Sequence, residues 1–168
     1  LANTRDIGVF NNTLKDTNQG DMDTRGISVR YGETTTLCCN YTEGHTTGVN
    51  FHGLSTNSHF RQNTLTGHET GLRYSPIGVT GPQKHAGNRW LGSFSDAGAR
   101  HMGPVNIVQL SIYDLRDPST PSLPLGLWPA NIIVTNGSPG DWFKIPPTGT
   151  EAASCFTDEE CEDGNLPP

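Results

Sequence analysis

The sequence predicts an all-β protein built from many short strands joined by turns. Gly and Pro together make up about a fifth of the 168 residues, and charged residues only 17%. No long window places apolar residues at i, i+3, i+4 and i+7, so little helix is expected. A β-rich chain punctuated by turn residues is typical of sandwiches and barrels. At this length we expect a single domain over residues 1–150 and an acidic tail over 151–168.

The stretch 26–54 carries the clearest strand pattern. Ile27, Val29 and Tyr31 alternate with polar residues, which predicts a strand with one buried face. Gly32 interrupts the pattern and suggests a bulge or a tight bend. A second short strand is expected around Val49 to Leu54.

The remaining elements follow in chain order. Residues 7–10 predict a short edge strand, and residues 55–89 a long polar loop that either binds something or covers a sheet. Residues 105–115 predict the strongest strand, with a bulge where the alternation changes phase. Further strands are expected at 132–134 and 142–145, and we recognise no internal repeat.

Residues 26–54 resemble the opening of the first cupredoxin domain of multicopper oxidases. The resemblance rests on the alternating strand ending in Gly32-Glu33 and on Phe51-His52-Gly53-Leu54, and it is confined to this stretch. It implies a cupredoxin-like Greek-key β-sandwich. In that family the motif has two histidines, whereas this chain has Asn50 in place of the first.

Three histidines are candidates for a metal site, which would be a copper site by the resemblance: His52, His101 and His59. The alternative is that His52 lies at the edge of the core and binds a backbone carbonyl. The family's late Cys-His-Met copper ligands are missing, because Cys155 is followed by Phe-Thr-Asp-Glu-Glu. No cofactor is therefore expected, with copper as the alternative.

The acidic turn at 16–26 offers a possible calcium loop through Asp16, Asn18, Asp21 and Asp23. Its spacing is not that of an EF-hand, and a solvated acidic turn is the simpler interpretation.

Four cysteines predict disulfides: Cys38, Cys39, Cys155 and Cys161. On a strand Cys38 and Cys39 would point to opposite faces, and the simplest pairing ties both to the tail. Four free thiols are the alternative. Glycosylation sequons occur at Asn11, Asn40 and Asn136. Cysteines and sequons together predict a secreted, extracellular glycoprotein.

Several activities lack support in the sequence. The net charge of −6 and the absence of a basic cluster disfavour nucleic acid, and no segment is apolar enough to span a membrane. There is no Gly-x-Ser-x-Gly elbow or phosphate loop. Nothing selects a catalytic pair from the candidate carboxylates, which are Asp96, Asp114, Asp117 and Asp141. Trp90, Trp128 and Trp142 could form a sugar platform, but each lies beside apolar residues and fits a core position.

These observations predict a non-catalytic extracellular module for binding or assembly, whose partners are other protein chains or a surface glycan. A copper oxidoreductase domain with an incomplete ligand set is the alternative. A viral jelly-roll coat protein is a further one. Enzymatic activity stays open, with no catalytic residue assigned.

Overall fold

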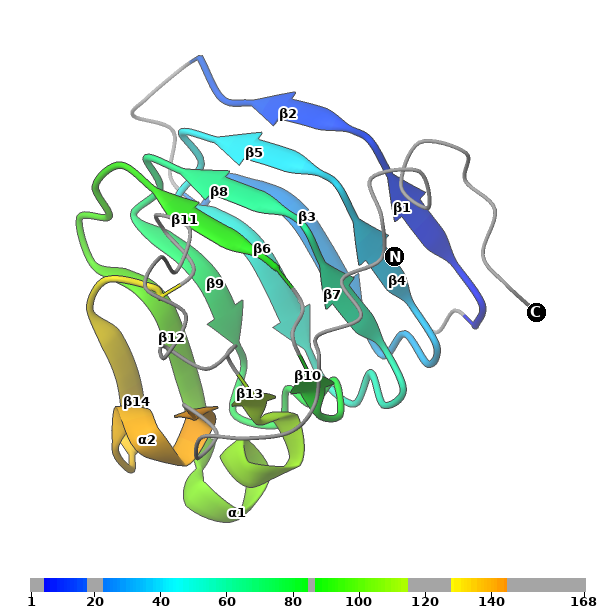
Figure 1. The fold of residues 1–168 in the computed structure, drawn as a ribbon, viewed down its shortest axis with the longest axis vertical. Helices are drawn as coiled ribbons and strands as arrows, with labels where there is room; N and C mark the ends of the chain where they lie inside the picture. The colour runs from blue at the N-terminus through cyan, green and yellow to red at the C-terminus, as the bar shows by residue number, and fades with distance from the viewer. Residues whose placement is uncertain (1–4, 18–22, 85–86, 115–127, 145–168) are drawn as a thin grey trace, which may run out of the picture.

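The computed structural model describes residues 5–17, 23–84, 87–114 and 128–144. The predicted all-β class is confirmed, but every strand pair in these ranges is parallel. The chain winds as a parallel β-solenoid of about three turns (Figure 1). The predicted cupredoxin-like Greek-key β-sandwich is therefore wrong, because it is built from antiparallel strands, as a jelly roll also is.

The described strands form four sheets. Successive turns of the solenoid contribute to three of them, and the fourth is a short sheet of β10 (Gln83–Lys84), β13 (Tyr113–Asp114) and β15 (Phe143–Lys144). The first sheet contains β1 (Gly8–Phe10), β4 (Thr36–Cys38) and β7 (His59–Arg61). The second contains β2 (Thr13–Lys15), β5 (Tyr41–Glu43), β8 (Thr64–Thr66) and β11 (Arg89–Leu91). The third contains β3 (Arg25–Arg30), β6 (Thr47–His52), β9 (Thr70–Tyr74), β12 (Ala97–Pro104) and β14 (Ile132–Asn136).

Two successive turns carry an internal sequence repeat, so the expectation of no repeat is wrong. Asn40, Gly44, His45, Thr47 and Gly48 recur one turn later as Asn63, Gly67, His68, Thr70 and Gly71, at a constant sequence offset of 23. The repeat is short and degenerate, and the other turns differ in length, which hides it. In a solenoid each repeat is one turn, so equivalent residues stack on one another.

The prediction that residues 55–89 form a long polar loop is also wrong. This segment contains β7, β8, β9 and the short strand β10 (Gln83–Lys84), so it forms a full solenoid turn and the beginning of the next. Its strands have few large apolar residues because a short solenoid strand turns only one or two side chains inward.

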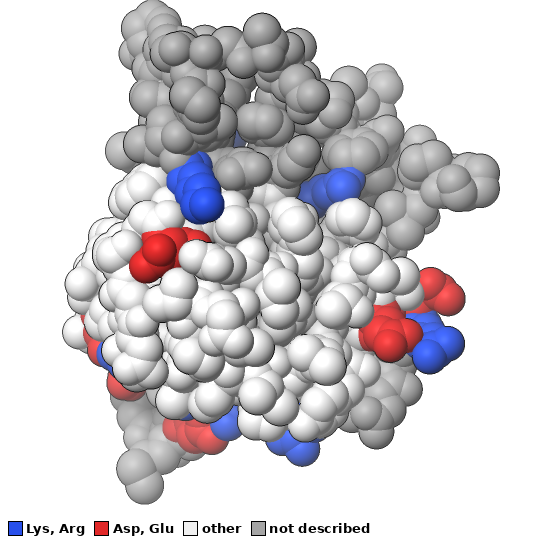
Figure 2. Space-filling view, turned by 90° about the horizontal axis from the view of Figure 1, so that it is seen from below, with Lys and Arg blue, Asp and Glu red and all other residues white. Residues whose placement is uncertain are grey.

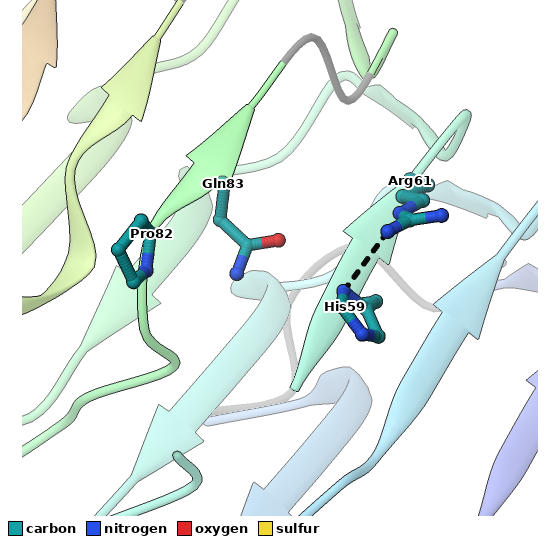
Figure 3. Close-up of a pocket in the computed structure, with 4 residues that line it drawn as sticks. All are labelled: His59, Arg61, Pro82 and Gln83. Carbon is teal, nitrogen blue, oxygen red and sulfur yellow. Dashed lines mark hydrogen bonds between the residues drawn. The ribbon is translucent and has the colours of Figure 1, made fainter. Parts of the chain in front are cut away.

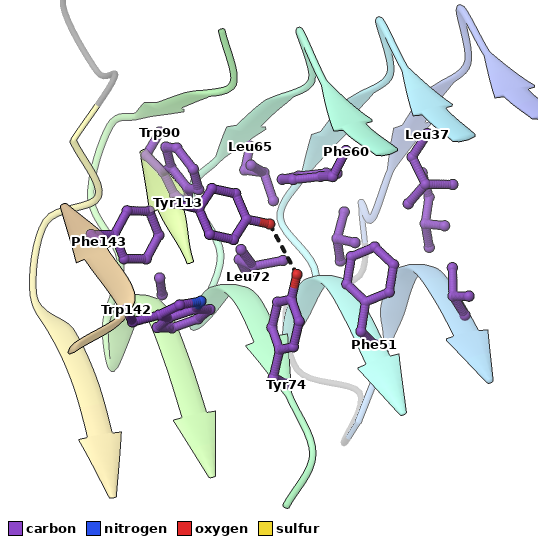
Figure 4. Close-up of a cluster of buried hydrophobic side chains, with 14 of the residues drawn as sticks. Leu37, Phe51, Phe60, Leu65, Leu72, Tyr74, Trp90, Tyr113, Trp142 and Phe143 are labelled. Atoms are coloured by element: carbon purple, nitrogen blue, oxygen red, sulfur yellow. Dashed lines mark hydrogen bonds between the residues drawn. The ribbon is translucent and has the colours of Figure 1, made fainter. Parts of the chain in front are cut away.

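Alternating side chains fill the interior between the sheets. Figure 4 shows Leu37, Phe60 and Leu65 from the first two sheets facing Phe51, Leu72 and Tyr74 of the third. All six are fully buried.

The strand pattern predicted at 26–54 is confirmed for most of its apolar positions. Ile27, Val29, Val49 and Phe51 are buried in the core. Tyr31 and Leu54 are the exceptions, because each follows the end of its strand. Tyr31 has a left-handed backbone conformation (φ 51°) and is 41% exposed, and Leu54 is 52% exposed. The alternation therefore ends where the chain leaves the sheet.

A separate group of elements closes the C-terminal end. It comprises α1 (Val105–Val108), the 3-10 helix η1 (Gln109–Ser111), β13 (Tyr113–Asp114), α2 (Pro139–Trp142) and β15 (Phe143–Lys144). Trp142 and Phe143 pack into the core, with Trp142 also against Tyr74 (Figure 4).

The prediction of a strong strand at 105–115 is mostly wrong, because residues 105–111 are helical and only Tyr113–Asp114 form a strand. Val105 and Val108 lie three residues apart on α1, so the phase change marks a turn of helix and not a bulge.

Candidate functional site

Stacked asparagines line the corner between the first and second sheets. We call Asn12, Asn40, Asn63 and Asn88 the asparagine ladder. The Asn63 amide donates to the Leu37 and Arg61 carbonyls, each at 2.8 Å, and to Asn88 Oδ1 at 3.0 Å. Its own Oδ1 accepts from the Asn40 backbone N–H at 3.0 Å. The ladder satisfies buried backbone groups where the chain turns, so its role is structural.

The corner between the second and third sheets holds a stack of flat rings. We call His45, His68 and Phe94 the ring stack. The His45 and His68 rings are 5.8 Å apart and nearly parallel, and Phe94 lies 6.3 Å from His68. The His45 backbone N–H donates to His68 Nδ1 at 3.1 Å, and His68 Nε2 lies 3.0 Å from the Thr42 carbonyl. Burial lowers the pKa of His68 to about 4, so its ring is neutral at pH 7.

The structure does not bring together the three predicted metal ligands. His101 points into the interior, His52 lies on the outer side of the third sheet, and His59 lies on the outer side of the first sheet. No group of three metal-ligating side chains occurs anywhere in the described part of the chain.

His101 is a core residue. Its ring stacks on Tyr74 at 5.0 Å and meets the edge of Trp142 at 5.1 Å, and its Nδ1 accepts from the Gly103 backbone N–H at 3.1 Å. Burial lowers its pKa to about 4. These contacts give the imidazole a packing role in the core.

The two described cysteines do not point to opposite faces. Cys39 has a left-handed backbone conformation (φ 56°), which turns its side chain beside that of Cys38, and the two sulfurs are 3.6 Å apart. This separation is too long for a bond between them. Cys155 and Cys161 lie outside the described residues, so the predicted disulfide pairing stays a prediction.

The sequons have different placements. Asn11 and Asn136 are exposed. Asn40 is buried in the asparagine ladder, with its amide donating to Val9 O and Asn63 Oδ1, so a glycan there would break the corner.

The calcium turn is described only in part. Asn18 and Asp21 lie outside the described residues. Asp23 forms an ion pair with Arg25, and Asp16 Oδ2 lies 3.8 Å from His45 Nδ1. The two described carboxylates therefore face cationic or imidazole groups, and the calcium loop stays a prediction.

The tryptophans do not form a common platform. Trp90 and Trp142 are buried core residues, and of the three only Trp128 is substantially exposed. Among the candidate carboxylates, Asp96 is held by Arg100 and Asp141 completes the capping box of α2. Asp117 and the side chain of Asp114 lie outside the part of the chain that the structure describes.

A hollow of about 200 Å³ lies on the outer side of the first sheet, lined by His59, Arg61, Pro82 and Gln83 (Figure 3). Arg61 Nη2 lies 3.1 Å from His59 Nδ1. Burial and the Arg61 charge lower the pKa of His59. The Gln83 side chain accepts from the Phe60 N–H and donates to the Ser58 carbonyl, so it is already used in holding the fold.

The turns between the third sheet and the next first-sheet strand, together with α1 and η1, form a surface with very little charge. We call this surface the turn face; its segments are 31–35, 53–58, 75–82 and 105–111. Glu33 is the one charged residue in these segments. Figure 2 views this side of the molecule, where a broad area carries no charged side chain and the charges lie toward its margins.

Half-exposed apolar side chains project from the turn face. Tyr31, Leu54, Ile77 and Leu110 are each 41–52% exposed. The first three follow one another at the offset of the sequence repeat, and this regular spacing is the signal in the sequence that could have identified them. Tyr31 packs over Gly53, where a Cβ would lie 2.5 Å from the ring.

Buried hydroxyl groups hold the turn face in place. Ser55 Oγ accepts from the Gly32 N–H at 3.2 Å, and Ser58 Oγ donates to the Gly32 carbonyl at 3.0 Å. Ser111 Oγ accepts from the Thr80 N–H at 2.9 Å, which brings η1 beside residues 79–80. Because small hydroxyls satisfy the backbone, the exposed apolar side chains stand on a firmly positioned surface.

No protein-family model, curated protein or solved structure matches this chain significantly. None of the helices in the described ranges has the length and apolar character needed to cross a bilayer.

Proposed function

We propose that this chain is a non-catalytic assembly module that associates with further copies of itself through the turn face. The observation that carries the proposal is the near absence of charge on a surface from which Tyr31, Leu54, Ile77 and Leu110 project. Apolar patches on otherwise polar proteins mark contact surfaces.

Charge favours a second copy as the partner. The chain carries a net charge of −6, so most surfaces of two copies repel each other on approach. The turn face has one carboxylate, Glu33, and that group forms an ion pair with Arg5 at 3.0 Å. Two copies can therefore meet on this face with little like-charge repulsion, whereas a charged partner would gain no complementary charge here.

Geometry supports the same partner. Successive solenoid turns are about 4.8 Å apart, so the projecting side chains repeat at that spacing along the face. An identical face turned by a two-fold axis presents the same spacing, which is the condition for its side chains to pack between those of the first copy. A secreted location stays a prediction from the sequons and cysteines, and it is compatible with such an assembly.

Sedimentation of the full chain over concentrations from micromolar to several hundred micromolar tests the proposal. We expect a reversible dimer or larger species that Leu54→Glu weakens by at least about tenfold, because the substitution places two carboxylates in the contact. Ser93→Glu, at an exposed position in the turn after β11 and away from the turn face, adds the same charge and should leave association unchanged. A monomer at every concentration, or equal effects of the two variants, would contradict the proposal.

A further inference from the structure

The outer side of the third sheet carries a row of side chains that crosses every strand. Register pairs place Ser28, Asn50, Arg73, Arg100 and Ile133 side by side on β3, β6, β9, β12 and β14. Their neighbours along the strands, including Val49, Phe51, Leu72 and Tyr74, point into the core. The row therefore faces outward.

The two arginines in this row have different partners. Arg100 is paired with Asp96: its Nε donates to Asp96 Oδ2 at 2.9 Å and its Nη2 donates to Asp96 Oδ1. Thr70 Oγ1 donates to the same carboxylate at 2.9 Å. Arg100, Thr70 and the charge of Arg73 lower the pKa of Asp96, so this carboxylate is ionised, and its oxygens are occupied by Arg100 and Thr70.

Arg73 lacks an equivalent partner. Its one hydrogen bond within the described residues is from Nη2 to the thioether sulfur of Met102 at 3.5 Å, and a thioether is a weak acceptor. Glu69, just before β9, is exposed and makes no ion pair with Arg73 in the described structure. The Arg73 side chain is partly exposed and its charge is attracted to the Asp96 carboxylate without a hydrogen bond, so most of its N–H donors are open to solvent or to a ligand.

We infer that Arg73 is the centre of an oxyanion-binding site on the third sheet. The guanidinium offers a planar fork of N–H donors, which suits the paired oxygens of a carboxylate, sulfate or phosphate group. Asn50 lies beside it on β6; its side chain is only 4% exposed, and its amide donates to Ser28 Oγ at 3.4 Å. Arg100 on β12 is paired with Asp96 and adds no net charge, so Arg73 is the guanidinium available to a ligand. The chemical class of the ligand is a molecule bearing one such oxyanion group.

This site is separate from the turn face. It lies on the strands of the third sheet, it is charged, and its ligand is small. Its presence or absence therefore does not depend on whether the chain associates with itself.

Binding can be measured by NMR on the full, ¹⁵N-labelled chain, with sodium sulfate, sodium phosphate or sodium acetate as the probe and sodium chloride at matched ionic strength as the reference. We expect a saturable shift of the Arg73 Nε–H and Asn50 amide signals with an oxyanion and a weaker, non-saturating one with chloride. The sulfate, phosphate and acetate arms separate a tetrahedral ligand group from a planar one.

Variants keep the test decisive. Arg73→Gln should reduce sulfate affinity by at least about tenfold, because a desolvated charged hydrogen bond is lost. Arg73→Lys keeps the charge without the fork and should weaken binding several-fold, which provides a second variant if the first does not fold. Arg89→Gln removes an exposed arginine on the second sheet and should have no effect. Responses that are alike for all anions, or alike at Arg73 and Arg89, would overturn the inference.

Discussion

The asparagine ladder and the ring stack occupy two corners of the same solenoid, yet they use different chemistry. The ladder repeats one residue type at each of its levels, because each amide must donate and accept at the same places. The ring stack accepts His45, His68 and then Phe94, because stacking needs only a flat ring. A corner held by directed hydrogen bonds therefore restricts the sequence more than a corner held by packing.

The backbone explains a second difference. The residue before each ladder asparagine has a positive φ. Only the last of these residues is a glycine, Gly87; the others are Asn11, Cys39 and Gln62. The hydrogen bonds of the ladder offset the strain of this conformation. At the ring stack, glycines provide the space, since a Cβ on Gly48 would lie 2.7 Å from the His68 ring.

Lowering the pH should distinguish the two corners more strongly than any substitution. The ring stack contains titratable histidines, whereas the asparagine ladder contains no titratable group. The pKa of His68 is about 4 in the folded chain and 6.5 without the fold, and the buried His101 of the core behaves alike. Between these values the unfolded chain binds more protons, so stability is full above pH 6.5 and falls as the pH drops toward 4. Each histidine contributes up to roughly 3 kcal/mol, measurable by urea unfolding at several pH values.

His68→Phe sharpens this test. It keeps a ring of the type that Phe94 supplies in the next turn but removes one titrating group. The variant should lose part of the pH dependence, although it is less stable at pH 7 because the His45 N–H loses its acceptor. A pH profile identical to that of the parent chain would show that His68 is not the responsible group.

Breaking the ladder at its centre should have the next largest effect. Asn63→Ala leaves the Asn40 N–H and the Leu37 carbonyl without their Asn63 partner in a buried corner. We expect a loss of roughly 3 kcal/mol in the free energy of unfolding, with the pH dependence of stability unchanged because no titrating group is removed. Chemical denaturation measures both, and a loss below about 1 kcal/mol would contradict the structural role of the ladder.

Filling the space beside the ring stack should reduce the free energy of unfolding somewhat less than Asn63→Ala does. Gly48→Ala places a methyl group 2.7 Å from both the Gly71 carbonyl oxygen and the His68 ring. We expect a loss of about 2 kcal/mol in the free energy of unfolding. Gly140→Ala is the matched control, because its nearest neighbour would be 3.9 Å away. Equal thermal stability of the two variants would show that the corner relaxes freely.

The smallest effect is expected at the open end of the ladder. Asn12 is exposed, and its amide donates to Phe10 O at 2.9 Å and Asn40 Oδ1 at 3.0 Å. In Asn12→Ala water replaces these partners, so the loss should be at most about 1 kcal/mol. A loss as large as that of Asn63→Ala would mean that the ladder acts as one cooperative unit.

Much of the local structure followed from the sequence. The alternation of Ile27, Val29, Val49 and Phe51 identified strands and their buried sides correctly, because a strand's inward positions are set by its own period. Whether the three candidate metal ligands come together could not be predicted in this way. His52, His59 and His101 looked equivalent in sequence, but they lie on two outer surfaces and in the core.

The sequence by itself determined that this chain is rich in strands, poor in helix and acidic. It also contained the regular spacing that links Asn40 to Asn63 and Tyr31 to Leu54, although turns of unequal length obscure this spacing. Only the tertiary structure decided that the strands pair in parallel with the next turn. Local alternation sets which side of a strand is buried, whereas the choice of partner strand depends on long-range hydrogen bonds such as those of the asparagine ladder.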